Sequence, residues 1–313
     1  MSDPTGGRSL RALLALLLST LALAGCMPVT RVADEGPAVE LTEVPFFPQE
    51  DYQCGPAALA SVLQWSGVPA TPATLAPTLM IPARQGSLQI ELLAQARAQG
   101  RVPFLIPGEL AALQAELAAG HPVIILQNLA FAWRPAWHYA VVVGSDPATQ
   151  TLVLRSGREP RHRLGWTLFE RTWARADRWG MVVLRPGELP VSVPPEAVLA
   201  AVIPFEEHQA WAVAEAVYRS AAARWPGQAV FRLGQANSLH AQARLTEAET
   251  LYRGLIVDFP DDPVIYNNLA LVLADGGRWQ EAEALVARAL ELGGPLREEF
   301  EDTQRQIRAR HGR

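Results

Sequence analysis

Between residues 43 and 185, short apolar runs alternate with turn residues, and their spacing predicts both helices and strands. Apolar positions three or four residues apart predict helices over 54–66, 73–79, 88–99, 109–119 and 168–176. Ser87 is the expected N-cap of the third of these helices. Apolar runs bounded by turn residues predict strands over 101–106, 122–127, 138–143, 151–155 and 181–184. Because helices precede a mainly antiparallel set of strands, we expect an α+β domain over 43–185.

After a Pro-rich linker at residues 186–195, the pattern predicts helices only, and it repeats. Similar residues recur every 34 positions. They are Ala214, Ala248 and Ala282, Tyr218 and Tyr252, and Pro226 and Pro260. This period, with an alanine, an aromatic residue and a proline in the second helix of each unit, resembles the tetratricopeptide repeat. We therefore expect an all-α tetratricopeptide-repeat domain over 196–313.

The first repeat fits the pattern poorly, because Pro204 is expected to interrupt its first helix. Two good repeats and one degenerate repeat are therefore predicted. Short arrays of this kind offer a concave surface for peptides, so a protein partner or substrate is expected there. The alternative, which the sequence leaves open, is a purely structural helical cap.

The N-terminus has the features of a targeting segment. Arg8 and Arg11 precede an apolar run, Ala12–Ala24, that is too short to span a bilayer comfortably. The run ends in Leu-Ala-Gly-Cys at Cys26, which resembles the bacterial lipobox. The resemblance implies a signal peptide at 1–25, lipidation of Cys26 (palmitate or a similar acyl chain) and a tether at 26–42. The alternative is an ordinary secretory signal in which Cys26 is incidental.

This resemblance also implies a location. It places the protein in a bacterial cell envelope, anchored to the membrane by lipid. Met27 stands where an aspartate is the inner-membrane retention signal in some bacteria. We therefore expect the outer membrane, with the protein facing the periplasm.

Composition excludes several classes of function. The net charge of −5 at pH 7 gives no electrostatic footprint for nucleic acid. All basic side chains other than histidine are arginine, so a Schiff-base lysine and a P-loop lysine are excluded. Cys26 and Cys54 are the two cysteines of the chain. If Cys26 carries lipid, Cys54 is a free thiol, and neither a structural metal site nor a cofactor is expected.

The candidate chemistry centres on Cys54, which stands before Gly55-Pro56 at the start of the first predicted helix. The positive end of a helix dipole favours a thiolate, the nucleophilic form of cysteine. His138 opens a predicted strand, and a cysteine at a helix start with a histidine at a strand start is typical of papain-like catalysis. Gln49 is positioned to donate an amide N–H to an oxyanion. Alone, such a cysteine or histidine is more often structural, so the assignment depends on their combination.

The motifs also resemble a known family. Gln-x4-Cys-Gly-Pro-Ala, beginning at Gln49, and His-Tyr-x-Val-Val-x-Gly, beginning at His138, are similar to motifs of the C39-like cysteine peptidases. That family includes domains that trim double-glycine leader peptides. The resemblance covers about residues 43–185 and implies a papain-like fold and peptide substrates with small residues before the cut.

Relatives commonly place an aspartate, often followed by proline, on the strand after the histidine strand. In this sequence, Asp146-Pro147 matches that pair of residues. However, Asp146 lies eight residues from His138, or about 26 Å along a straight strand. A hairpin around residues 147–148 instead brings residues near Ser156 and Gly157 opposite His138. We therefore predict that Ser156 orients the imidazole, and that this neutral partner gives a weaker or more selective enzyme.

The loop before His138 is rich in aromatic residues. Trp133 and Trp137 are candidate substrate-binding residues that would narrow the cleft. The alternative, weighed equally, is that they cover an edge of the core.

The best interpretation of the whole chain is an exported, membrane-anchored cysteine peptidase with partner-binding repeats. Two alternatives remain: a non-catalytic envelope assembly or scaffold lipoprotein, and an acyltransferase that uses the same Cys-His site. The substrate, the oligomeric state and the choice between hydrolysis and acyl transfer are not determined by the sequence.

Overall fold

The computed structural model describes residues 36–49, 53–81 and 86–312. The predicted signal peptide, Cys26 and most of the tether lie outside these residues. By its internal contacts the chain divides into the units Met1–Gly36 and Pro37–Arg313, and the second is described below. Among the described residues, none of the helices combines the length and the apolar character needed to cross a membrane.

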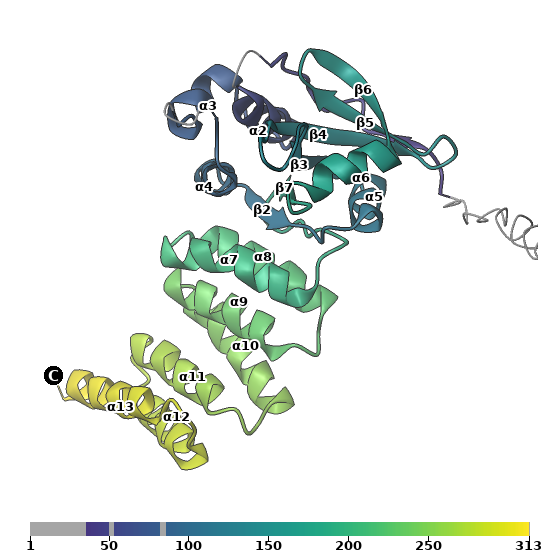
Figure 1. The fold of residues 1–313 in the computed structure, drawn as a ribbon. Helices are drawn as coiled ribbons and strands as arrows, with labels where there is room; N and C mark the ends of the chain where they lie inside the picture. The colour runs from purple at the N-terminus through teal and green to yellow at the C-terminus, as the bar shows by residue number, and fades with distance from the viewer. Residues whose placement is uncertain (1–35, 50–52, 82–85, 313) are drawn as a thin grey trace, which may run out of the picture. The chain divides into compact units, whose positions relative to one another are not determined.

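The first half of this unit is built on an antiparallel sheet (Figure 1). Within the described residues the sheet has seven strands in the order β2-β7-β3-β4-β5-β6, with β1 paired to β4. The strands are β1 Val39–Glu40, β2 Val102–Leu105, β3 Val123–Asn128, β4 Trp137–Asp146, β5 Thr151–Ser156, β6 Glu159–Gly165 and β7 Gly180–Leu184. The central strands β3 and β7 are buried along their whole length, which explains their continuous apolar runs.

Helices cover the sheet on both sides. They are α2 Cys54–Trp65, α3 Pro72–Leu79, α4 Gln89–Ala98, α5 Leu110–Ala118 and α6 Trp166–Ala174. Gln114 of α5 donates a hydrogen bond to Ser145, and Gln127 donates one to Thr172 of α6, so polar contacts join these helices to one face. α2 packs on β4 from the other side, with Leu59 and Leu63 fully buried (Figure 1). The predicted α+β domain is confirmed.

Some predicted details are wrong. Ser87 does not cap α4: the N-cap is Leu88, without a side-chain hydrogen bond. The strand that begins near His138 runs on to Asp146. β6 was not predicted, because its sequence from Glu159 is polar and its side chains are mostly exposed. An edge strand of this kind lacks the apolar pattern that marks a strand in sequence.

The second half consists of helices in a regular array. They are α7 Pro195–Glu207, α8 Trp211–Arg224, α9 Ala229–Ala241, α10 Leu245–Asp258, α11 Pro263–Asp275, α12 Trp279–Leu292 and α13 Arg297–His311. The first helices of successive units begin 34 residues apart, and so do the second helices. α13 begins on the same period, as the first helix of a further unit. The predicted repeat domain is therefore confirmed.

Pro204 does not interrupt the first repeat, so that prediction is wrong. It lies inside α7, which ends three residues later at Glu207. A proline so close to the C-terminus of a helix leaves nearly all of the preceding hydrogen bonds in place. As a result, the first helical pair is as long as the later pairs.

One hydrophobic core joins the sheet to the first helical pair. Val198 and Val202 of α7 and Val217 of α8 are fully buried in the same cluster as the strands. The connecting segment is also held in place: Glu116 accepts a hydrogen bond of 2.7 Å from the N–H of Ser192. The later helices form a second cluster.

Candidate active site

Cys54 occupies the first position of α2 and is half-buried. Pro56 follows within the first turn, where a helix does not need its missing N–H. Gly55 allows a close approach, since a Cβ there would come 2.7 Å from the Ser87 hydroxyl. The Cys-Gly-Pro motif therefore starts the helix and lets a neighbouring segment pack against it beside the thiol.

The thiol has two opposing influences on its protonation. Burial raises the pKa of Cys54, while the backbone N–H groups of Tyr139, Gly55 and Cys54 itself lower it. Burial prevails, so Cys54 is a protonated thiol at neutral pH in this conformation. Removing its proton requires a base.

His138 is the second residue of β4 and lies opposite Gln127 of β3. Its Nε2 is hydrogen-bonded to the Ser156 hydroxyl at 2.8 Å. Burial lowers the pKa of His138, and the charge on His162 lowers it further. The ring is thus a neutral base at neutral pH, with Nδ1 left for a second partner. Among the described contacts, no hydrogen bond joins this ring to the Cys54 thiol, which instead faces the N–H of Tyr139.

Gln49 is held from both ends of its carboxamide. Nε2 donates to the Tyr139 carbonyl at 3.3 Å, and Oε1 accepts from the Gly157 N–H at 3.0 Å. The backbone N–H of Gln49 also donates to the Gly157 carbonyl, at 2.8 Å. Because Nε2 carries two hydrogens, one N–H remains for an oxyanion beside the thiol.

Asp146 lies at the opposite end of β4 from His138. Its Oδ1 accepts hydrogen bonds from the N–H groups of Ala148 (3.1 Å) and Thr149 (3.3 Å). Hydrogen bonding, first from the Thr149 hydroxyl, lowers the pKa of Asp146. The aspartate therefore stabilises the β4–β5 turn and does not approach the imidazole.

The aromatic loop, residues 129–136, and the following Trp137 project into solvent. Trp133 is 79% exposed and Trp137 55% exposed, and Phe131 stacks on Trp133 with ring centroids 5.9 Å apart. The loop is nevertheless ordered, because Asn128 Oδ1 accepts from the N–H groups of Ala130 and Ala136 at 3.0 Å each. These tryptophans do not cover the core, so the aromatic surface beside His138 is available for contact.

The hydrogen bonds of Tyr139 and Gly157 to the site were not predicted. Both act through backbone groups, which any residue type supplies. The one available signal was the glycine itself, since Gly157 has a φ of +58°. His162 was also missed, because it lies on the unpredicted strand β6.

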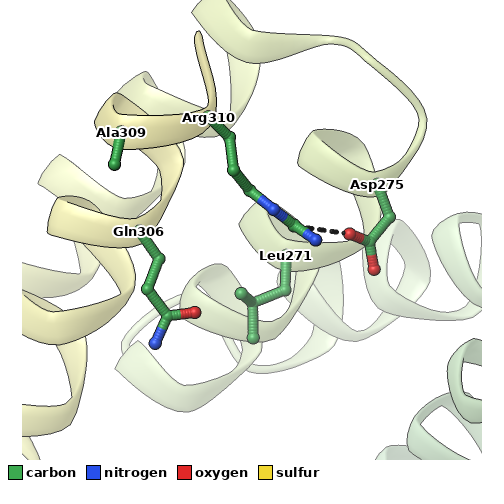
Figure 2. Close-up of a pocket in the computed structure, with 5 residues that line it drawn as sticks. All are labelled: Leu271, Asp275, Gln306, Ala309 and Arg310. Carbon is green, nitrogen blue, oxygen red and sulfur yellow. Dashed lines mark hydrogen bonds and ion pairs between the residues drawn. The ribbon is translucent and has the colours of Figure 1, made fainter. Parts of the chain in front are cut away.

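The repeats contain a separate pocket of about 510 Å³, lined by Leu271, Asp275, Gln306, Ala309 and Arg310 (Figure 2). Asp275 bonds Arg310 at 2.7 Å and His240 of α9 at 2.8 Å. One carboxylate thus links α9, α11 and α13. With its charges paired internally, the pocket stabilises the array and has no part in the Cys54 site.

Comparisons with known proteins match the two halves separately. Residues 41–178 match the Peptidase_C39 like family. Residues 205–263 and 233–296 match the tetratricopeptide repeat. No curated protein matches the chain.

Solved structures similar to each half are known. A Bacillus anthracis protein described as a C39-like peptidase has 16% identity and a TM-score of 0.41, covering 48% of this chain and 98% of its own. The Yersinia enterocolitica type III secretion chaperone SycD, in complex with a peptide of the translocator YopD, has 19% identity and a TM-score of 0.34, covering 37% and 88%. The TPR2B domain of yeast Sti1, in a complex with pHsp70, has 16% identity and a TM-score of 0.35, covering 37% and 96%.

The two family matches fall on the two structural regions described above. The chain therefore carries a domain of the C39-like peptidase family at residues 41–178, followed by tetratricopeptide repeats at residues 205–296.

Proposed function

We propose that the protein is a cysteine peptidase that hydrolyses peptide bonds with Cys54 and His138. The observation that carries this proposal is the hydrogen bond of 2.8 Å between His138 Nε2 and Ser156. It orients a neutral imidazole next to the strand backbone that faces the Cys54 thiol, and leaves Nδ1 as the proton acceptor. No metal or cofactor is invoked.

In the proposed reaction, Cys54 Sγ attacks the scissile carbonyl carbon while His138 takes the thiol proton. The carbonyl π electrons move to oxygen, and the oxyanion accepts hydrogen bonds from Gln49 Nε2 and the Cys54 backbone N–H. The C–N bond then breaks, and His138 protonates the leaving amine. Water attacks the remaining thioester, giving up a proton to His138, and the C–S bond breaks to restore the thiol.

The proposed substrate is a peptide or protein with small residues before the cut, because the motifs at Cys54 and His138 resemble those of the C39-like peptidases. Trp133 and Trp137 are proposed to contact it, because they are exposed and lie in the segment that leads into His138. The repeats are proposed to recruit a protein partner or the substrate. The structures of SycD with a peptide and of the Sti1 domain with pHsp70 make this a reasonable role for such helices.

Location is part of the proposal. We infer an exported lipoprotein whose Cys26 carries the acyl chains that hold it on a bacterial membrane, facing the periplasm. The support is the Leu-Ala-Gly-Cys sequence after the apolar run Ala12–Ala24.

Labelling by iodoacetamide tests the catalytic assignment without a known substrate. Peptide mass spectrometry of the full chain should find rapid carbamidomethylation of Cys54 at neutral pH. In His138→Ala the rate should fall by at least tenfold, because the raised pKa of Cys54 leaves little thiolate without a base. A rate that is equal in the two proteins would contradict the proposal.

A second candidate is a non-catalytic scaffold, and one observation favours it. The thiol and imidazole are both neutral in this conformation, and the group beside His138 is a hydroxyl in place of a carboxylate. A slow, His138-independent labelling rate would support this alternative. If labelling depends on His138, acyl transfer to an amine is distinguished from hydrolysis by identifying the products.

A further inference from the structure

The β4–β5 ladder stops short of the site. The paired residues nearest the site are Val142 with Leu154 and then Val141 with Arg155. If the same register continued, Tyr139 would lie opposite Gly157. These two residues are bridged instead by Gln49, which is far away in sequence.

The carboxamide of Gln49 fills the place of a ladder hydrogen bond. Its Oε1 takes the N–H of Gly157, and its Nε2 supplies a donor to the carbonyl of Tyr139. A backbone N–H only donates and a backbone carbonyl only accepts, so this pair fixes which end of the amide is nitrogen. The Gln49 side chain therefore has one orientation, with Nε2 at the Tyr139 side, where the thiol also lies.

Gly157 lies in the turn that allows this contact with Gln49. It is in the tight turn between Ser156 of β5 and Glu159 of β6, which are paired across the hairpin. Both of its backbone polar groups bond Gln49, at 2.8 and 3.0 Å. Its φ of +58° is a conformation that residues with a Cβ seldom adopt. Its neighbour Ser156 holds His138 at 2.8 Å.

We propose that Gly157 is a positioning residue, whose turn sets the oxyanion donor Gln49 and the imidazole of His138 in register with each other. This inference rests on the proposed peptidase function. By this proposal, one backbone turn positions both Gln49 and His138, which lie 89 residues apart in sequence and belong to different parts of the fold.

The test variant is Gly157→Ala in the full chain. No atom lies within 4 Å of a Cβ at this position, so the substitution acts through the backbone angle and not through a clash. Gly120→Ala is the matched control: Gly120 has a φ of +90°, also has nothing within 4 Å of a Cβ, and follows α5 away from the site. Gly120→Ala carries the larger backbone penalty, because a φ of +90° lies further outside the left-handed region open to alanine than +58° does, so it controls for backbone strain alone. Circular dichroism and thermal unfolding should show that both variants fold.

Two probes report on the two positioned groups. Iodoacetamide alkylates Cys54 with loss of iodide and of the thiol proton, so the pH dependence of its rate reports the base. Acetyl-glycyl-glycinal adds the thiol across its aldehyde to give a hemithioacetal whose oxygen occupies the oxyanion position. Its affinity, measured as protection of Cys54 from iodoacetamide, reports the Gln49 donor. Mass spectrometry localises the label to Cys54.

Gly157→Ala should weaken aldehyde protection by roughly tenfold or more, approaching the loss seen in Gln49→Ala, because a misplaced donor no longer reaches the oxygen. It should also change the pH profile of alkylation, whereas Gly120→Ala should match the wild type in both measurements. Wild-type values for Gly157→Ala, with alkylation still dependent on His138, would overturn this inference alone. Alkylation that does not depend on His138 in the wild type would instead overturn the proposed function.

Discussion

At the residue scale, the candidate site is a pair of neutral groups. Burial raises the pKa of the Cys54 thiol and lowers that of the His138 imidazole. In the proposed reaction, His138 takes the thiol proton as the sulfur attacks an electrophile. Without a base, the raised pKa of Cys54 leaves little thiolate at neutral pH.

The pH dependence follows from His138. Its base form is present above its pKa, which lies below the usual 6.5 of histidine. We therefore expect the alkylation rate of Cys54 to rise through an acid limb centred below pH 6.5 and to stay high at pH 7. In His162→Gln, loss of the neighbouring positive charge should move that limb to higher pH. A limb that moves to lower pH in this variant would contradict the assignment.

Ser156 and Asp146 provide a paired test of the third member of the site. Ser156→Ala should lower kcat, because the imidazole loses the hydrogen bond at Nε2. Asp146→Ala should leave kcat unchanged and lower the thermal stability only slightly, through the lost turn contacts. Ser156→Asp should raise kcat, since a carboxylate stabilises an imidazolium more strongly than a hydroxyl does. If Asp146→Ala loses activity and Ser156→Ala keeps it, the assignment is wrong and Asp146 is the residue that orients the imidazole.

At this scale, sequence reasoning finds side chains and misses backbone groups. Ser156 was predicted from the length of a strand and the position of a turn, both of which are local in the sequence. The bonds of Gln49 to the Tyr139 carbonyl and to the backbone of Gly157 were missed, because they depend on where Gln49 comes to lie. That contact joins segments more than a hundred residues apart.

At the element scale, the aromatic loop is a rigid apolar projection next to a strand end. Asn128 ties its two limbs together, and Arg175 of the segment after α6 holds the Asn128 carbonyl at 2.8 and 3.1 Å. Rigidity lowers the entropy that would be lost on binding a substrate. This makes the loop a suitable contact surface.

Trp133→Ala should raise KM for a peptide substrate several-fold with little change in kcat, because the side chain lies at the loop and not at the reacting atoms. Stability should stay within about 0.5 kcal/mol of the wild type, since 79% of the residue is exposed. Val257→Ala, equally exposed at 79% on α10, is the control. An unchanged KM in Trp133→Ala would exclude the loop from substrate binding.

Elements with a strong apolar period were predicted well, and polar ones were not. α2, α3 and the buried strands follow their patterns closely. β6 and the two-residue strand β1 carry too few buried side chains to leave a pattern. Pro204 shows the converse: a residue that breaks a helix in its middle is tolerated in its last turn.

At the scale of the whole molecule, the first helical pair contributes to the core of the half that contains the candidate site. Val198 and Val202 are fully buried in the same cluster as the sheet. Each such side chain is worth about 1.5–3 kcal/mol when buried. Together they amount to a large part of the stability of a typical domain.

Truncation tests this dependence. A fragment of residues 27–228, which keeps α7 and α8, should unfold cooperatively and retain His138-dependent labelling of Cys54. A fragment of residues 27–195 should be strongly destabilised or aggregate, because the apolar surface that α7 covers becomes exposed. If the shorter fragment is as stable as the longer one in thermal unfolding, the shared core is not needed for the fold.

The anchoring proposal is also tested on the whole protein. The mature chain isolated from a bacterial host should begin at Cys26 and carry acyl chains, and Cys26→Ser should partition into the aqueous phase of a detergent extract. An internal peptide containing unmodified Cys26 in the mature protein would exclude lipidation.

The shared core also has an evolutionary consequence. The first family match ends at residue 178 and the second begins at residue 205, so a recombination event between them would exchange the two matched regions. Such an event would separate the sheet from the helices that complete its interior. A viable crossover has to fall beyond α8, because the first cluster reaches Phe231 of α9 before the second cluster begins. The first helical pair is therefore expected to be inherited with the peptidase half, and the later repeats to be free to vary in number.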